Sequence, residues 1–208
     1  MESLIIDEVR AEKKILELLR FVFWKEPTRE LLLDFLNASL IEEENDIDRG
    51  LNLMNRTVRS HEDQLDSYLE DLAIEFTRLF LGPANPVAVP FGSFYLSETK
   101  RLMTDETIEI RKRYLDAGVA AKFLHSVPDD HISTELEFLA LVAQDTISLS
   151  EEGERLEASR KYEIMHDFMV NHLALWAPAF AKSIIEDTNE DFFRGAAITL
   201  QGFVSLSS

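Results

Sequence analysis

Residues 65–81 read LDSYLEDLAIEFTRLFL, and the large apolar residues of this stretch recur at intervals of three and four positions. That spacing places them along one face of an amphipathic α-helix. Residues 136–147 and 162–176 repeat the pattern, whereas the apolar–polar alternation typical of β-hairpins is missing. The sequence therefore predicts an all-α fold.

Helix start signals and the scarcity of turn-forming residues support this prediction. Thr28 follows a proline at the start of one segment. Ser60, Thr134 and Thr188 each precede an acid by three positions, which is the spacing of a capping box. Only 7 glycines and 6 prolines occur in 208 residues, which favours long helices over a many-stranded sheet. We expect one compact bundle of about nine helices, at residues 3–25, 28–40, 46–59, 61–81, 105–118, 131–149, 154–174, 176–187 and 189–205.

One segment, residues 82–92 with the sequence GPANPVAVPFG, interrupts the helical pattern. It holds three of the six prolines, and proline fixes the backbone and removes a hydrogen-bond donor. We therefore expect a single domain, in which a connecting loop at 83–96 joins an N-terminal helical half, 1–82, to a C-terminal half, 97–208. The loop is unusually apolar for a solvated linker, so we expect it to pack onto the protein or to offer its aromatic rings to a ligand.

A second break lies at residues 126–131, which read SVPDDH. Pro128 ends one element, and Asp129 and Asp130 stand where the next helix presents its free N–H groups. The spacing alone leaves two interpretations open: the acids cap that helix, or they accept hydrogen bonds from a ligand.

Charge and composition exclude several classes of partner. Acidic residues outnumber Lys and Arg by 39 to 21, which gives a net charge of −18. Nucleic acids and anionic lipid surfaces attract cationic proteins, so we expect neither, and cationic or apolar ligands remain. The chain has no cysteine, no N-terminal secretory pattern and no uninterrupted apolar run of ~20 residues. We expect a cytoplasmic protein without direct membrane insertion.

Candidate catalytic and metal sites are weak. Glu163 and His166 have the Glu-x-x-His spacing of di-iron helical bundles, but such sites need two of these pairs. His131 and Glu135 lie four positions apart, and two ligands do not complete a metal site. No nucleophile elbow or phosphate-binding glycine loop occurs. We expect no catalytic residue, metal or cofactor; a carboxylate–metal helical enzyme built on Glu163 and His166 is the less favoured alternative.

Four motifs follow one another along the chain: EFTRLFLGP at residues 75–83, VPFGSFYL at 89–96, PDDH and ELEF within 128–138, and HLALWAPAFA at 172–181. Together they resemble the TorD/DmsD family of redox enzyme maturation proteins, which is distantly related to NarJ. Phe91 stands where this family usually has tryptophan, and we therefore expect a smaller pocket at the loop.

The resemblance implies an all-helical cytoplasmic chaperone and not an enzyme. Family members bind the twin-arginine signal peptide of a molybdenum-cofactor oxidoreductase and hold the apoprotein back until its cofactor is inserted. The expected partners are the signal peptide and the apoprotein of a molybdopterin oxidoreductase, with the chaperone as a monomer or homodimer. An acidic protein suits this ligand, because carboxylates accept arginine side chains bidentately and apolar rings can bury the stretch that follows. A helical adaptor for another basic or amphipathic peptide is the alternative from a different class.

The resemblance also points to the peptide-binding residues. Phe76, Leu79 and Phe80 match binding positions of the family, although a place in the core explains such a helical stripe more simply. Pro90 and Phe91 match the family's Pro-Trp pair, and Asp130 and His131 match its acid–histidine pair.

Specific roles follow from this assignment. We expect Phe76, Phe91 and Tyr95 to be apolar contacts of the peptide. Asp129 and Asp130 are the expected guanidinium acceptors. His131 is then a donor or an orienting group, although a histidine in the first turn of a helix is more often a surface or capping residue.

Overall fold

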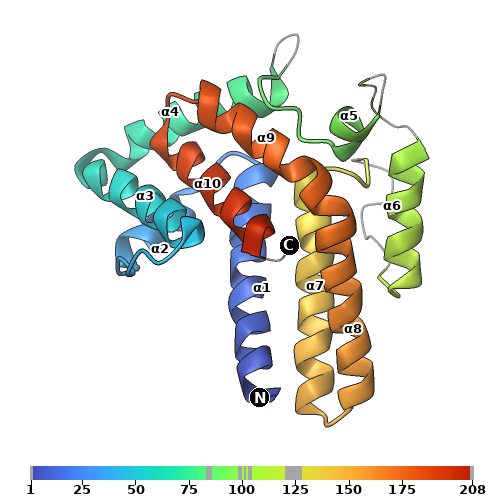
Figure 1. Cartoon of the computed structure of the whole chain (residues 1–208). Coiled ribbons are helices and arrows are strands. Elements are labelled where there is room, and N and C mark those ends of the chain that lie inside the picture. The colour runs from blue at the N-terminus through green and yellow to red at the C-terminus, as the bar shows by residue number, and fades with distance from the viewer. Residues whose placement is uncertain are drawn as a thin grey trace. The chain divides into compact units, whose positions relative to one another are not determined.

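The computed structural model describes residues 2–82, 86–97, 100, 102, 105–119 and 128–206 (Figure 1). These residues form helices and no strand, so the prediction of an all-α protein is confirmed. The α-helices are α1 (Glu2–Trp24), α2 (Arg29–Asn37), α3 (Asp46–Ser60), α4 (Leu65–Phe76), α5 (Gly92–Leu96), α6 (Asp105–Asp116), α7 (Ile132–Glu151), α8 (Arg155–Phe168), α9 (Ala174–Asp187) and α10 (Asp191–Leu206).

Each of the nine expected helices has a helical counterpart, and the short α5 is an addition that the sequence did not indicate. Thr28 caps α2 as predicted, because its Oγ1 accepts a hydrogen bond from the backbone N–H of Leu31. The capping box predicted at Thr134 is wrong, since this residue lies inside α7 and the cap is His131. The loop residues 83–85 and 126–127 lie outside the described part of the chain.

The break expected near residue 175 is replaced by a continuous helical run. The π-helix η3 (Met169–Leu173) connects α8 to α9, and α9 continues past Pro178. A proline inside a helix removes one backbone hydrogen bond, and π-helices, although rare, occur mostly as single turns inside α-helices. Residues Arg155–Asp187 are long and apolar enough to cross a membrane by length and composition, but half of the most apolar window is buried, and a core helix meets the same criteria.

Contacts divide the chain into two compact units, each made of two separate segments. The first unit comprises Met1–Phe21 and Phe91–Trp176, and the second comprises Val22–Pro90 and Ala177–Ser208. The boundaries fall inside α1, between Pro90 and Phe91, and inside α9. Each unit therefore combines residues from both expected halves of the chain, and the single-domain organisation stays a prediction.

In the second unit, α3 and α10 pack side by side (Figure 1). Glycines permit the close approach: a Cβ added to Gly195 would lie 2.6 Å from the carbonyl oxygen of Gly50, and one added to Gly50 would lie 2.3 Å from Oγ1 of Thr199. Because these are shorter than van der Waals contacts, both positions require a residue without a side chain. The interface of α3 and α10 thus depends on backbone-to-backbone packing.

The apolar stripe of residues 65–81 forms part of the core of this second unit. Leu72 is fully buried, and Phe76 and Phe80 are each 4% exposed. The Phe80 ring lies 5.0 Å from that of Phe76, 5.8 Å from that of Phe23 and 5.9 Å from that of Phe193, between ring centroids. These are the distances of favourable aromatic pairs. The apolar face of this helical segment is therefore buried in the core, as the amphipathic pattern predicts.

A buried carboxylate ties the end of α4 to the turn before α10. The Glu75 carboxylate accepts hydrogen bonds from Nε and Nη2 of Arg78, each at 2.7 Å. It also accepts hydrogen bonds from Thr188 Oγ1 at 2.8 Å and from the Asn189 N–H at 3.1 Å. Burial acts to raise the pKa of Glu75, but these donors outweigh it and lower that pKa. The residue is therefore ionised and fully hydrogen-bonded inside the protein.

In the first unit, α7 runs antiparallel to both α1 and α8 (Figure 1). Two ion pairs join α1 to α7, from Arg10 to Glu151 at 2.5 Å and from Arg20 to Glu137 at 2.9 Å. The turn from α7 to α8 uses Gly153, whose φ of +85° favours glycine. The Tyr114 ring of α6 packs on this hairpin, with its centroid 4.5 Å from that of Phe138 on α7 and 6.1 Å from that of Phe168 on α8.

Candidate functional site

The last two residues of the first predicted break, Phe91 and Gly92, meet the end of the second break in the first unit. Phe91, within the first break, and His131, at the end of the second, form an isolated antiparallel β-bridge. Their rings pack edge to face with centroids 5.0 Å apart, and the Gly92 N–H donates to the carbonyl oxygen of Asp130 at 2.8 Å. The motif around Phe91 and the motif around Asp130 therefore belong to one local structure.

Asp130 anchors this structure. Its Oδ2 accepts the Ser93 N–H at 2.8 Å, and its Oδ1 accepts the Thr107 hydroxyl at 3.1 Å. Ser93 lies in the first turn of α5 and Thr107 in the first turn of α6, so one carboxylate holds the starts of both helices. Asp130 is 1% exposed, and these two hydrogen bonds explain why an acid stands at this position.

Asp129 already holds a guanidinium group from its own chain. Nε of Arg111 donates to its Oδ2 at 2.5 Å, and the Tyr114 hydroxyl donates to its backbone carbonyl at 2.8 Å. The Asp129 side chain is buried, whereas that of Arg111 is 44% exposed. Burial and the nearby carboxylates raise the pKa of Tyr114, so its hydroxyl is a stable donor.

His131 caps α7. Its Nδ1 accepts the Ser133 N–H at 3.2 Å and lies 2.7 Å from the Ser133 hydroxyl. Burial lowers the pKa of His131 to about 4, although the charge of Asp130 acts in the opposite direction. The imidazole is therefore neutral at pH 7, and an Nδ1 that accepts from a backbone N–H places the ring proton on Nε2.

A second buried carboxylate, Glu135, comes from α7, and its hydrogen-bond donors lie in η3 and at the start of α9. Glu135 is fully buried and accepts hydrogen bonds from His172 Nε2 at 2.8 Å and Trp176 Nε1 at 3.2 Å. Burial raises the pKa of Glu135, and His172 and Trp176 oppose that rise. A Cβ on Gly92 would lie 3.1 Å from Trp176 Nε1, so the start of α5 packs directly onto this group.

Tyr95 completes the cluster by stacking on Trp176, with ring centroids 5.7 Å apart and planes 22° apart. We call the residues Phe91, Gly92, Tyr95, Asp130, His131, Glu135, His172 and Trp176 the bridge cluster. From the sequence, Glu135 was expected only as a partner of His131 in a weak metal site, and no individual role was expected for His172 or Trp176. The available signal was that all three lie within the ELEF and HLALWAPAFA motifs.

The structure places the expected peptide-binding residues in two groups. Five of them lie in the first unit, which brings together Phe91, Tyr95, Asp129, Asp130 and His131. The other four lie in the second unit, namely Phe76, Leu79, Phe80 and Pro90.

Their exposure also differs. Phe91, Tyr95 and His131 are partly exposed, whereas the two aspartates and the four residues of the second unit are buried. Neither Asp129 nor Asp130 caps α7, whose cap is His131. Asp130 instead binds the first turns of α5 and α6, and Asp129 binds Arg111. Contact of all nine residues with a peptide stays a prediction.

Within the described ranges, no group of three or more His, Asp or Glu side chains is placed to hold a metal ion. The described part of α8 contains both members of the Glu163 and His166 pair, and each is exposed. The geometry of the bridge cluster instead suits ligand recognition, because the partly exposed rings of Phe91 and His131 lie beside the buried, hydrogen-bonded carboxylate of Asp130.

Comparison with known proteins assigns the family. Residues 31–182 match the family model described as "Nitrate reductase delta subunit". The chain belongs to this family. Individual relatives can also be named. "Chaperone protein TorD" of Vibrio parahaemolyticus is 31% identical to this protein over 162 residues, which cover 78% of this chain and 72% of the relative. "Chaperone protein TorD" of Vibrio cholerae is 27% identical over 210 residues, covering 98% and 92%.

A third relative, "Chaperone protein TorD" of Photobacterium profundum, is 28% identical over 144 residues, covering 69% of this chain and 64% of the relative. The resemblance to the TorD/DmsD family that the four motifs indicated is thereby confirmed. These relatives are named chaperones, and the family of nitrate reductase delta subunits and TorD proteins is not an enzyme family.

Proposed function

We propose that the protein is a cytoplasmic chaperone that binds the twin-arginine signal peptide of a molybdenum-cofactor oxidoreductase and assists maturation of the apoprotein before export. Membership of the family of TorD chaperones supports the maturation role. The main support for a peptide-binding site at the bridge cluster is the bridge between Phe91 and His131, which presents two partly exposed rings. Tyr95 belongs to the same cluster.

The chemistry of the ligand fits this surface in two parts. The apolar stretch of a signal peptide gains free energy by covering aromatic rings, at roughly 25 cal/mol per Å² of apolar surface removed from water, and Phe91 and Tyr95 offer such rings. The net charge of −18 attracts the cationic part and speeds its approach.

The paired arginines need carboxylates, and Asp129 is the acceptor that we assign to one of them. Its present partner, Arg111, is partly exposed and reaches it from α6. We propose that a peptide guanidinium takes the place of Arg111 at Asp129. This exchange keeps the buried carboxylate paired, which avoids the cost of leaving a buried charge alone.

A titration with synthetic peptides tests the proposal. The probes are a twin-arginine leader peptide and its Lys-Lys variant, measured by isothermal titration calorimetry against wild type, Phe91→Ala and the control Leu175→Ala. Leu175 is 64% exposed and lies outside the bridge cluster. We expect Phe91→Ala to weaken binding about tenfold, because a large ring contributes more than 1 kcal/mol to such a contact, and the control to bind as wild type does.

The same titration separates the alternatives. Binding of the Lys-Lys peptide as tightly as the twin-arginine peptide would favour an adaptor for basic or amphipathic segments in general. Unchanged binding by a folded Phe91→Ala variant would place the peptide site away from the bridge cluster.

A further inference from the structure

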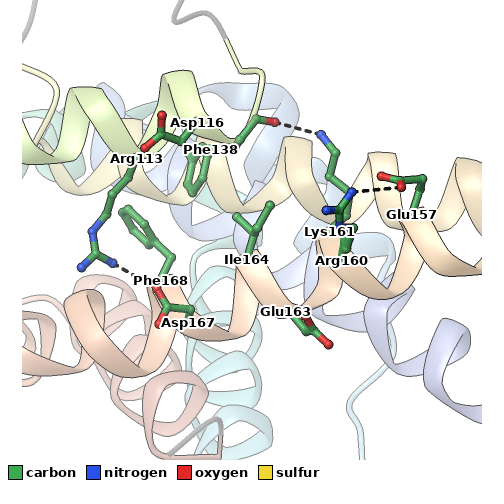
Figure 2. A pocket seen from close by; sticks show the side chains of 11 residues that line it. Arg113, Asp116, Phe138, Glu157, Arg160, Lys161, Glu163, Ile164, Asp167 and Phe168 are labelled. Carbon is green, nitrogen blue, oxygen red and sulfur yellow. Dashed lines mark hydrogen bonds and ion pairs between the residues drawn. The ribbon is translucent and has the colours of Figure 1, made fainter.

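A cavity of about 670 Å³ opens in the first unit between α6, α7 and α8 (Figure 2). Its deepest part is apolar: Phe138 and Phe168 are each 2% exposed, their ring centroids lie 4.8 Å apart, and the partly exposed Ile164 lies with them between α6 and α8. This α6–α8 groove shares no residue with the bridge cluster.

Polar contacts bridge the two helices at each end of the groove (Figure 2). At one end Arg113 of α6 donates to Asp167 of α8 at 3.3 Å. At the other, Nζ of Lys161 donates to the carbonyl oxygen of Ala117 at 2.9 Å and to Asp145 at 2.7 Å. The apolar middle is therefore held open as a slot between two fixed contacts.

The charges around the slot are unbalanced. Arg113 and Lys161 are paired as described, and Arg160, the third cation, pairs with Glu157 at 3.2 Å. In contrast, Asp116 on α6 and Glu163 on α8 are exposed and have no hydrogen-bond or ion-pair partner among the described residues. The groove thus offers, on both sides of an apolar floor, exposed carboxylates without a protein partner in the described part of the chain.

We propose that the α6–α8 groove is a second peptide-binding site, which binds a segment of a partner protein with an arginine or lysine within one helical turn of a large apolar side chain. The apolar side chain contacts Ile164 above the two rings, and the cation interacts with Asp116 or Glu163. The three cations of the groove are already neutralised, so an acidic segment finds no free partner there. A cationic amphipathic segment is the occupant that satisfies both the floor and the rim.

The test uses the tetrapeptide acetyl-Leu-Arg-Phe-Leu-amide and its Glu counterpart, acetyl-Leu-Glu-Phe-Leu-amide, titrated into ¹⁵N-labelled protein and followed by NMR. The groove variant is Asp116→Asn/Glu163→Gln. Its control, Glu152→Gln/Glu154→Gln, removes the same charge from two exposed residues between α7 and α8 that do not line the groove. Ile164→Ala probes the floor.

We expect the Arg peptide to shift amide signals of α6 and α8, and the Glu peptide to bind at least tenfold more weakly. Asp116→Asn/Glu163→Gln and Ile164→Ala should each lose at least fivefold in affinity for the Arg peptide, whereas the control should lose none. Equal binding of the two peptides, equal affinity of groove variant and control, or no binding by wild type would overturn the inference. Shifts confined to the bridge cluster would overturn it as well, because they would assign the peptide to that site. The twin-arginine leader peptide is titrated separately into wild type, Phe91→Ala and Asp116→Asn/Glu163→Gln. A loss of its affinity confined to Phe91→Ala belongs to the bridge cluster and one confined to the double variant belongs to the groove, so failure at one site is distinguishable from failure at the other.

Discussion

The backbones of Phe91 and His131 pair in an isolated bridge, and their rings meet edge to face with centroids 5.0 Å apart. This pairing joins two segments that lie 40 positions apart and that each interrupt the helical pattern of the sequence. The bridge leaves both rings partly exposed, while Asp130 holds the backbone beneath them. Its effect is to convert two loops into one defined surface.

Asp130 should be the residue on which this surface depends most. We expect Asp130→Ala to destabilise the protein by about 1–3 kcal/mol, because it removes the acceptor for the Ser93 N–H and the Thr107 hydroxyl and leaves both donors buried. Urea denaturation measures this loss, and hydrogen exchange should show faster exchange of the Gly92 and Ser93 amides. Glu152→Ala, which removes an exposed acid, is the control; equal stability of the two variants would contradict the anchoring role.

Arg111 should compete with a bound peptide. If a peptide guanidinium replaces it at Asp129, then Arg111→Gln frees the acceptor, and we expect the twin-arginine peptide to bind about three- to tenfold more tightly. Lys112→Gln is a matched control, because it removes one exposed positive charge from the next position of α6 without touching Asp129. Calorimetry on both variants separates the exchange from a general change in net charge: equal gains in both would leave Asp129 without this role.

His131 should make stability depend on pH. Burial lowers the pKa of His131 in the folded protein to about 4, below its ordinary value of 6.5. The unfolded chain therefore binds more protons between these values, so this contribution is complete above pH 6.5 and is lost as the pH falls toward 4. It amounts to at most about 3 kcal/mol.

His131→Asn tests this dependence. Asparagine keeps a side-chain acceptor for the Ser133 N–H at the start of α7 but does not titrate. Urea denaturation at several pH values between 4 and 7 should show a shallower loss of stability in the variant than in wild type. Parallel curves for the two proteins would show that His131 is not the group responsible.

Hydrophobic periodicity was sufficient to predict the longer helices, though not the five-residue α5, because burial of one face determines which residues of a helix are apolar. Leu72 and Phe76 recur at helical spacing and lie in the core for that reason. Thr28 was likewise predictable, since its cap involves only the backbone three residues ahead. Local interactions of this kind can be predicted because they join residues that are close in the sequence.

The partners of the buried carboxylates were not predictable in the same way. Asp130 stands next to the start of α7, and its sequence position suggested a cap there, yet it binds Ser93 and Thr107, which lie 37 and 23 positions away. Glu135 is satisfied by His172 and Trp176, on another helix. Such pairings depend on how helices pack in space, so the spacing of residues along the chain does not predict them. The division into two units, each from two chain segments, has the same origin.

Glu75 should stabilise the second unit through its charge. It is 6% exposed and accepts four hydrogen bonds, two of them from Arg78, and the net effect of these donors is a pKa below the ordinary 4.5. A carboxylate with a lowered pKa stabilises the fold above its unfolded pKa and loses that contribution as the pH falls through the folded value. We expect Glu75→Gln to cost about 1–3 kcal/mol at pH 7 and progressively less below pH 4.5. Glu70→Gln, an exposed change on the same helix, should cost almost nothing at any pH; denaturation curves that show the same difference for Glu75→Gln at pH 7 and pH 3 would mean that packing, and not the charge of Glu75, stabilises this turn.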